Sequence, residues 1–179
     1  MQGRIWYNLF NISGNKVINL VPVFESSQIR FVEVSELLVK DYLDMVNDYE
    51  NVNRFIGGEH KTFTEEQERK WVQRKLEEKA LVFSMLEKKS GEFIGNIELM
   101  DVNNFAAELG IAITAAKQNS GYGTEAVLAV TEYGVRQLGL KRVFLRTDPH
   151  NSRAIHVYQK CGFKEYERTD EHVYMELRR

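Results

Sequence analysis

The segment Glu108–Thr124 reads ELGIAITAAKQNSGYGT and decides the fold that we expect for this chain of 179 residues. Its first half, through Thr114, is apolar and rich in β-branched residues, which predicts a strand. Its second half, from Gln118, is a glycine-containing turn that opens a helix. Glycines let backbone amides approach a ligand, and a helix begins with unpaired N–H groups and a positive dipole end. The segment therefore predicts an anion site suited to a phosphate or diphosphate.

The rest of the chain alternates between strand-like and helix-like stretches. Apolar alternation predicts strands, and apolar spacings of three and four residues after capping residues predict helices. We expect helices over 36–47, from Thr64 onward, over 126–138 and from Asn151 to Gly162, and strands over 29–34, 80–86, 92–100, 106–114, 142–147, 163–167 and 172–177. A hairpin over residues 5–23 would precede them. These elements predict an α+β protein with a mixed, mainly antiparallel twisted sheet and helices on both faces.

Composition excludes several classes of protein. The 24 basic and 26 acidic residues give a formal charge of -2, which disfavours nucleic acid as a partner. No stretch approaches the ~20 apolar residues of a membrane span, and no apolar signal core follows Met1, so we expect a cytoplasmic protein without a membrane partner. A single cysteine, Cys161, excludes an internal disulfide. The four histidines lack metal-ligand spacing, so we expect no metal site.

A second informative stretch, Asn151–Phe163, reads NSRAIHVYQKCGF. On a helix, residues that are three, four and three apart share one face, as do Asn151, Ala154, Tyr158 and Cys161. The glycine turn alone is a weak signal, because it matches neither the dinucleotide fingerprint nor the P-loop, and a simple tight turn would account for it. Its combination with this second stretch is much more specific.

Together the two stretches resemble the GCN5-related N-acetyltransferase (GNAT) superfamily. Its hallmark, Gln/Arg-x-x-Gly-x-Gly/Ala, is met by Gln118, Gly121 and Gly123, and its later Asn-x-x-Ala-x-x-x-Tyr-x-Lys-x-Gly-Phe run is met in full. Residues 94–99 and 107–110 are similar to a strand pair of ribosomal-protein-type and small-amine N-acetyltransferases.

The resemblance covers residues 29–179, which we therefore expect to form the N-acetyltransferase domain. Residues 1–28 would be an N-terminal strand or hairpin extension. One departure is that residues 115–117 lack the proline that many members carry before the loop.

The resemblance also implies a binding site for acetyl-CoA. In this superfamily the strand before the loop and the next parallel strand, here 142–147, splay apart, and the pantetheine arm lies between them like a missing strand. Backbone amides of the glycine turn would hold the diphosphate. The cofactor-binding residues implied in this way are Ile111, Ala112, Ile113, Gln118, Asn119, Ser120, Gly121, Tyr122, Gly123, Thr124, Asn151, Ala154 and Tyr158.

The chemistry of amide formation adds candidate catalytic residues. An amine with a pKa near ~10 must lose a proton before it attacks a thioester, and a carboxylate is the usual base. Glu98 and Glu108 would lie nearly opposite each other if Asn103 centres their hairpin, with space for an acceptor beside them. The amine would attack the acetyl carbonyl directly, with a backbone N–H near Ile113 as oxyanion donor. Tyr158 would protonate the departing thiolate.

Alternatives remain open for the residues and for the function. Tyr158 could be a core aromatic and Glu108 an ordinary strand carboxylate. The leading function is acetyl transfer to a protein N-terminus, a polyamine or another small amine. A non-catalytic acyl-CoA sensor and a nucleotide-binding or protein-interaction module are the alternatives. Residues 36–79, including the loop 55–58, would recognise the acceptor, and a homodimer is common among proteins of this kind.

Overall fold

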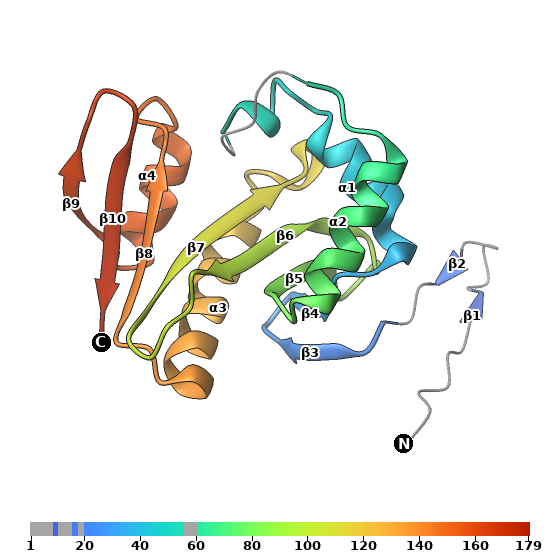
Figure 1. Ribbon diagram of the computed structural model, residues 1–179, viewed down its shortest axis with the longest axis horizontal. Coiled ribbons are helices and arrows are strands. Elements are labelled where there is room, and N and C mark those ends of the chain that lie inside the picture. Colours follow the sequence, from blue (N-terminus) through green and yellow to red (C-terminus); the bar gives the residue numbers. More distant parts are fainter. Residues whose placement is uncertain (1–8, 11–15, 18–19, 56–60) are drawn as a thin grey trace.

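A computed structural model describes residues 9–10, 16–17, 20–55 and 61–179. In these ranges it contains an eight-stranded sheet with the order β3-β4-β5-β6-β7-β8-β10-β9, beside a small β1-β2 pair (Figure 1). The strands are β1 (Leu9–Phe10), β2 (Lys16–Val17), β3 (Pro22–Glu25), β4 (Ile29–Glu33), β5 (Leu81–Glu87), β6 (Phe93–Met100), β7 (Ala106–Ile113), β8 (Arg142–Thr147), β9 (Lys164–Arg168) and β10 (Val173–Arg178). The helices are η1 (Glu36–Leu38), α1 (Val39–Val46), η2 (Asn53–Phe55), α2 (Glu65–Glu77), η3 (Ala115–Lys117), α3 (Tyr122–Leu138) and α4 (Ser152–Lys160).

The large sheet is mixed and mainly antiparallel, as the sequence predicts. Only β7 and β8 run parallel among its neighbouring strands in the described part of the chain. The predicted N-terminal hairpin is described only where β1 pairs with β2, and residues 5–8 and 13–15 lie outside the described residues. Residues 22–25 form β3, which pairs with β4 at one edge of the large sheet.

Helices cover both faces of the sheet, because the central strands carry apolar side chains on each face. One core lies between the sheet and α3 and α4, and it includes Val130 and Tyr158. A second core lies under α1 and α2 and includes Tyr42 and Val72. Figure 1 shows α1 and α2 on one side of the central strands and α3 on the other. The predicted layering is therefore confirmed.

Capping residues set the helix limits where the sequence predicts them. Thr64 accepts a hydrogen bond from the Gln67 backbone N–H at 3.3 Å, while the Gln67 side chain accepts one from the Thr64 N–H at 2.8 Å. This reciprocal capping box begins α2. Gly139 ends α3 in the left-handed region, with φ of 71°, which a glycine adopts without strain.

Strands β7 and β8 diverge along their length. They pair only from Ala106 opposite Arg142 to Glu108 opposite Phe144, although β7 continues to Ile113 and β8 to Thr147. Figure 1 shows the two strands together at one end and apart at the other. The second half of β7 thus has an open edge on its β8 side, as the resemblance implies.

Candidate functional site

The open edge of β7 presents the backbone groups of alternate residues. The Thr114 N–H donates to Ile94 on the β6 side at 2.9 Å, so the Ile113 carbonyl of the same peptide points toward the open edge. Strand residues alternate in this respect, so the N–H groups of Ile111 and Ile113 face the open edge and the groups of Ala112 face β6. Backbone contact with a ligand in the gap would therefore involve Ile111 and Ile113 rather than Ala112.

The turn before α3 has the geometry of an anion site. Asn119 and Gly121 have positive φ angles, 60° and 87°, as occur in turns whose successive backbone N–H groups bind anions. Gly121 is the N-cap residue of α3 and makes no side-chain capping bond, so the first amides of the helix keep their donors free of a side-chain cap. A Cβ on Gly123 would lie 3.4 Å from Ile113 Cδ1, an ordinary van der Waals contact, so the start of α3 packs beside the end of β7.

Gln118 connects the turn to its surroundings. Its Nε2 donates to the Ile113 carbonyl at 2.9 Å and to the Asn51 carbonyl at 3.1 Å. Its Oε1 accepts from Arg153 Nη1 at 2.6 Å. The side chain therefore ties the turn to β7, to the η2 segment and to α4, and any ligand contact would have to compete with these bonds.

Helix α4 brings three of the predicted residues to the same region. Asn151 Oδ1 caps the helix by accepting from the Ala154 N–H at 3.1 Å, which leaves the amide nitrogen as its donor. Ala154 is half-buried and, like Ile111 and Ile113, packs against the core between the sheet and α3 and α4. The small side chain at Ala154 takes up little space on this face of α4.

Tyr158 lies in the core between α4 and the sheet, with only 7% of its surface exposed. Its ring contacts Phe163, with 6.0 Å between the centroids, and its hydroxyl has no hydrogen-bond partner among the described residues. Burial raises the pKa of Tyr158 to about 12, so the phenol holds its proton at neutral pH. Burial likewise raises the pKa of the Cys161 thiol to about 11, as suits a packed residue rather than a nucleophile.

The two candidate bases share a face of the sheet but do not lie opposite each other, so that expectation is wrong. Glu98 pairs with Gly110, whereas Glu108 pairs with Met100. The hairpin is centred on Asn104 and not on Asn103, because Asn103 Oδ1 accepts from two following amides, each at 2.9 Å. A shift of the turn by one residue displaces the pairing by two.

Each carboxylate instead has its own cation, and the sequence gives no signal for either pairing. Glu98 Oε2 lies 2.8 Å from Lys75 Nζ of α2, and both side chains are largely buried. Glu108 Oε1 lies 3.4 Å from Nε of Arg146, whose side chain is 60% exposed. The space expected above Gly110 is filled, because a Cβ there would lie 3.0 Å from the Met100 methyl carbon.

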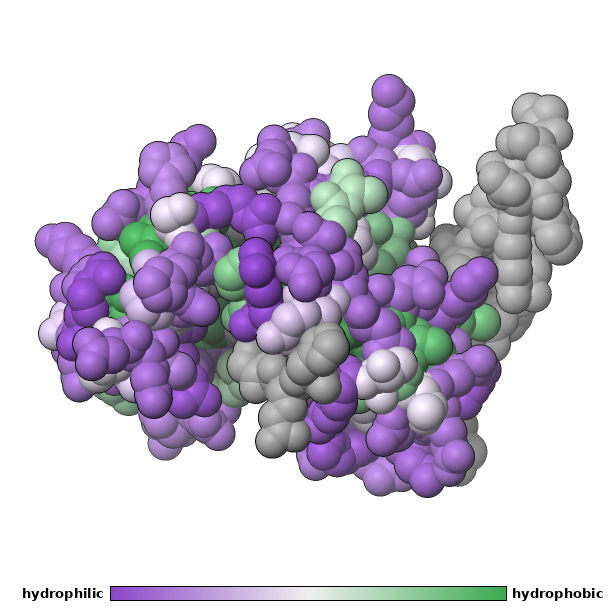
Figure 2. Space-filling view, turned by 90° about the horizontal axis from the view of Figure 1, so that it is seen from above, coloured by the Kyte–Doolittle hydropathy of each residue, from purple (hydrophilic) through white to green (hydrophobic). Residues whose placement is uncertain are grey.

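A cavity of about 220 Å³ opens beside the turn and the start of α4. Its lining residues come from the η2 segment, the turn and α4: Glu50, Asn51, Arg54, Phe55, Gln118, His150, Asn151, Ser152 and Arg153. Figure 2 looks down on this end of the molecule, where hydrophilic side chains predominate. The cavity brings part of the predicted acceptor region next to predicted cofactor residues. Residues 56–58 of that region lie outside the described residues.

Two absences apply to the described ranges. Within 20–55 and 61–179 and the β1-β2 pair, no three His, Cys, Asp or Glu side chains gather in a way that could hold a metal ion. In the same ranges, every helix is too short or too polar to cross a bilayer.

Known proteins resemble this chain in sequence and in fold. A segment of 75 residues is 37% identical to the spermidine N(1)-acetyltransferase of Escherichia coli (strain K12) and covers 41% of this chain and 40% of that protein. The chain thus matches about two fifths of that relative's length. The structure of spermidine N-acetyltransferase from Vibrio cholerae in complex with CoA and spermine has a TM-score of 0.77 at 19% identity, covering 86% of this chain and 96% of that one.

A second solved structure, a putative ribosomal-protein-serine acetyltransferase from Vibrio cholerae, has a TM-score of 0.70 at 18% identity. It covers 89% of this chain and 100% of that chain. At such identities these two likenesses bear on the fold alone. The family model described as "Acetyltransferase (GNAT) domain" matches residues 28–164, which is most of the chain. This chain therefore belongs to the GNAT acetyltransferase family.

Proposed function

We propose that the protein transfers an acetyl group from acetyl-CoA to a primary amine. The observation that carries this proposal is the divergence of β7 from β8 directly before the uncapped amino end of α3. An open strand edge suits an extended, amide-containing chain, and free helix amides suit a diphosphate. Acetyl-CoA carries both groups in one molecule. The spermidine N(1)-acetyltransferases among the relatives support the same reaction class.

We propose that acetyl-CoA follows a continuous path along these residues. The diphosphate would accept hydrogen bonds from the amides of residues 119–124. The pantetheine amides would bond the backbone of Ile111 and Ile113, with the Asn151 amide nitrogen as a side-chain donor. Ala154 would leave room for the arm beside α4. The acetyl end would then lie near Tyr158, at the bottom of the gap.

For proton removal from the acceptor we propose Glu108. Both candidate carboxylates lie on the face that carries α2, but they differ in how firmly a cation holds them. Glu98 is held by a largely buried Lys75 at 2.8 Å, whereas Glu108 contacts an exposed arginine at 3.4 Å. Arg146 is largely exposed and its contact with Glu108 is long, so solvent weakens this pair and Glu108, itself 16% exposed, can exchange Arg146 for an incoming ammonium group.

The reaction would then proceed by direct attack. Glu108 takes a proton from the ammonium group, and the neutral nitrogen attacks the carbonyl carbon of the thioester. A backbone N–H of β7 near Ile113 that faces the gap and is not bonded to the pantetheine arm donates to the developing oxyanion. As the carbon–sulfur bond breaks, the Tyr158 hydroxyl donates its proton to the leaving sulfur. The second proton lost by the acylated nitrogen restores the Tyr158 phenol, and Glu108 releases its proton to solvent. The products are an acetylated amine and free CoA.

The acceptor that we propose is a small amine such as a polyamine. The relatives include spermidine N(1)-acetyltransferases, and one solved structural neighbour contains spermine. Carboxylates on the α2 face would attract the positive charge of such an acceptor. A protein N-terminus is the second candidate acceptor, because the neighbours include a putative ribosomal-protein-serine acetyltransferase.

The experiment that tests this function follows thiol release from acetyl-CoA in the presence of spermidine, spermine, a peptide N-terminus or no amine. Amine-dependent release with acetylated product in mass spectrometry is the expected result. Tight CoA binding without turnover on any amine would indicate an acyl-CoA sensor. Absence of CoA binding in calorimetry would refute the proposal. Self-association stays a prediction that analytical ultracentrifugation can measure.

A further inference from the structure

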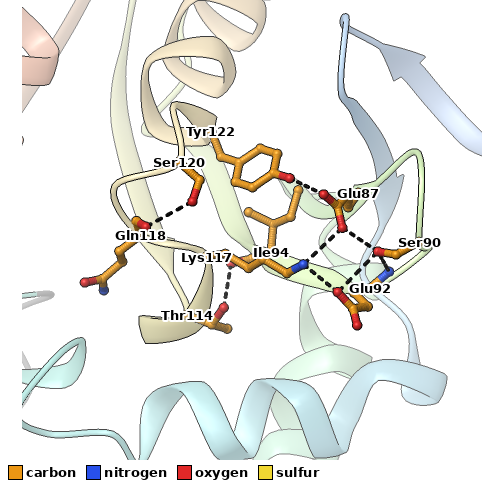
Figure 3. Close-up of polar contacts among 9 residues, drawn as sticks. All are labelled: Glu87, Ser90, Glu92, Ile94, Thr114, Lys117, Gln118, Ser120 and Tyr122. Atoms are coloured by element: carbon orange, nitrogen blue, oxygen red, sulfur yellow. Dashed lines mark hydrogen bonds and ion pairs between the residues drawn. The ribbon is translucent and has the colours of Figure 1, made fainter.

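Both ends of the proposed diphosphate turn meet at a single carboxylate, Glu87 at the end of β5 (Figure 3). The residue before the turn, Lys117, places its Nζ 3.0 Å from Glu87 Oε2. The residue after the turn, Tyr122, donates its hydroxyl hydrogen to Glu87 Oε1. The side chains therefore close residues 118–121 into a loop of fixed span, although Glu87 lies about thirty residues away in the sequence.

Further contacts hold Glu87 itself in place. Ser90 Oγ donates to Glu87 Oε2 at 2.5 Å, and Lys117 Nζ also lies 2.5 Å from Glu92 Oε2. The side chains of Glu87 and Lys117 are only 20% and 18% exposed. These hydrogen bonds, from Ser90, Tyr122 and Lys117, lower the pKa of Glu87 to about 2, so the carboxylate stays ionised at neutral pH.

The same end of α3 has a second attachment one turn further along. Glu125 accepts from Ser26 Oγ at 2.6 Å, from the Gln28 N–H at 2.6 Å and from Gln28 Nε2 at 2.9 Å. The two attachments are adjacent, since Ile29 pairs with Glu87 across β4 and β5. The first turn of α3 is thus held to one corner of the sheet by side chains of both Tyr122 and Glu125.

Charge makes an electrostatic role for Glu87 in anion binding untenable. A carboxylate near a diphosphate repels it, and Glu87 together with Glu92 also neutralises Lys117, the basic residue next to the turn. Any favourable effect of Glu87 on diphosphate binding must therefore come from geometry. Backbone amides bind an anion well only when they are already held in the converging arrangement.

We propose that Glu87 is a positioning residue for acetyl-CoA, which fixes the diphosphate turn by joining Lys117 and Tyr122 at its two ends. This assignment rests on the proposed function, because it takes the turn to be the diphosphate site. It adds a residue from outside the two sequence motifs to the apparatus that binds acetyl-CoA.

The test compares Tyr122→Phe, Glu87→Ala and Glu87→Gln with the unaltered protein. We expect Tyr122→Phe and Glu87→Ala to weaken CoA binding by about tenfold in calorimetry and to raise KM for acetyl-CoA equally, with kcat changed less than twofold. That factor corresponds to about 1.4 kcal/mol. Glu87→Gln keeps an acceptor for the Tyr122 hydroxyl, so its CoA affinity should fall between those of the unaltered protein and Glu87→Ala. The double variant Tyr122→Phe/Glu87→Ala should bind CoA no more weakly than Glu87→Ala alone, because both substitutions remove the same hydrogen bond.

Tyr42→Phe is the matched control, since it also removes a tyrosine hydroxyl that bonds within the protein. Tyr42 Oη lies 2.7 Å from Ser84 Oγ in the second core, away from the turn. This variant should lower Tm yet leave CoA affinity unchanged.

Three results would overturn the assignment. The first is a CoA affinity that is unchanged in Tyr122→Phe and Glu87→Ala. The second is tighter CoA binding in Glu87→Ala or Glu87→Gln, which lack the negative charge. The third is a loss of CoA affinity in Tyr42→Phe as large as that in Tyr122→Phe. If the unaltered protein binds no CoA, the proposed function fails first and this assignment fails with it. If it binds CoA and transfers acetyl groups while the variants do the same with unchanged KM, only the positioning role fails.

Discussion

Replacing Tyr158 with Phe removes the proposed proton donor while leaving the fold almost untouched. The ring would still fill its place in the core against Phe163. The lost hydroxyl makes no hydrogen bond to a described residue, so no partner is left unsatisfied. We therefore expect Tm to change by less than about 2 °C.

The size of the kinetic effect follows from the two acidities involved. A thiol in water has a pKa of about 8.5, whereas the Tyr158 phenol has a pKa of about 12. Proton transfer from this phenol to a solvated thiolate would therefore be unfavourable by roughly 5 kcal/mol. Burial also raises the pKa of a thiol, as Cys161 shows with about 11. If the CoA thiol is similarly buried, the difference between its pKa and that of the phenol falls to about one unit, or about 1.4 kcal/mol. Proton donation is then feasible, and we expect kcat to fall about 100-fold in the variant, at the low end for a general acid.

The assay measures thiol release against acetyl-CoA concentration, with CoA affinity determined separately by calorimetry. We expect kcat to fall while the Kd for CoA stays within twofold. Because the Tyr158 phenol remains protonated until about pH 12, its titration should contribute no inflection to the pH–rate profile below pH 10. A kcat within twofold of the unaltered enzyme would refute the proton-donor role. A loss of kcat matched by an equal loss of CoA affinity would point instead to a packing role.

Four further substitutions test other parts of the structure. Glu108→Gln should lower kcat by about 100-fold and Glu98→Gln by less than tenfold, and the reverse order in steady-state kinetics would move the base to Glu98. Gly95→Ala should destabilise the protein by about 3 kcal/mol, because the added Cβ would lie 2.0 Å from the Ala112 carbonyl oxygen and the φ of Gly95 is 156°. An unchanged midpoint in denaturant unfolding would contradict this. Phe24→Ala should lower the free energy of unfolding by about 2 kcal/mol, since the half-buried ring stacks on Phe31 and Tyr133 at centroid distances of 4.4 Å and 4.8 Å. A free energy of unfolding equal to that of the unaltered protein would show that the Phe24 ring adds nothing to the core.

Much of the fold could be predicted because its signals are local. The capping box at Thr64, the left-handed Gly139 and the turn at Gly121 each depend on hydrogen bonds or φ angles within a few residues. Strand limits follow from alternation over short windows. The glycine turn and the α4 run also carry the family resemblance, because both motifs are contiguous in the chain.

The relation between Glu98 and Glu108 could not be predicted with the same certainty. Which residues face each other in a hairpin depends on the centre of the turn, and Asn103 moves that centre by one residue through its side-chain hydrogen bonds. A small local choice therefore changes every pairing along two strands.

The sequence by itself determined which segments become strands and helices and where the glycine turn before α3 lies, since the relevant interactions join near neighbours. Only the tertiary structure decided that Glu87 joins Lys117 to Tyr122 and that Lys75 holds Glu98. Those contacts join residues about twenty or more positions apart, and they form only once strand order, register and helix placement bring the side chains within hydrogen-bonding distance.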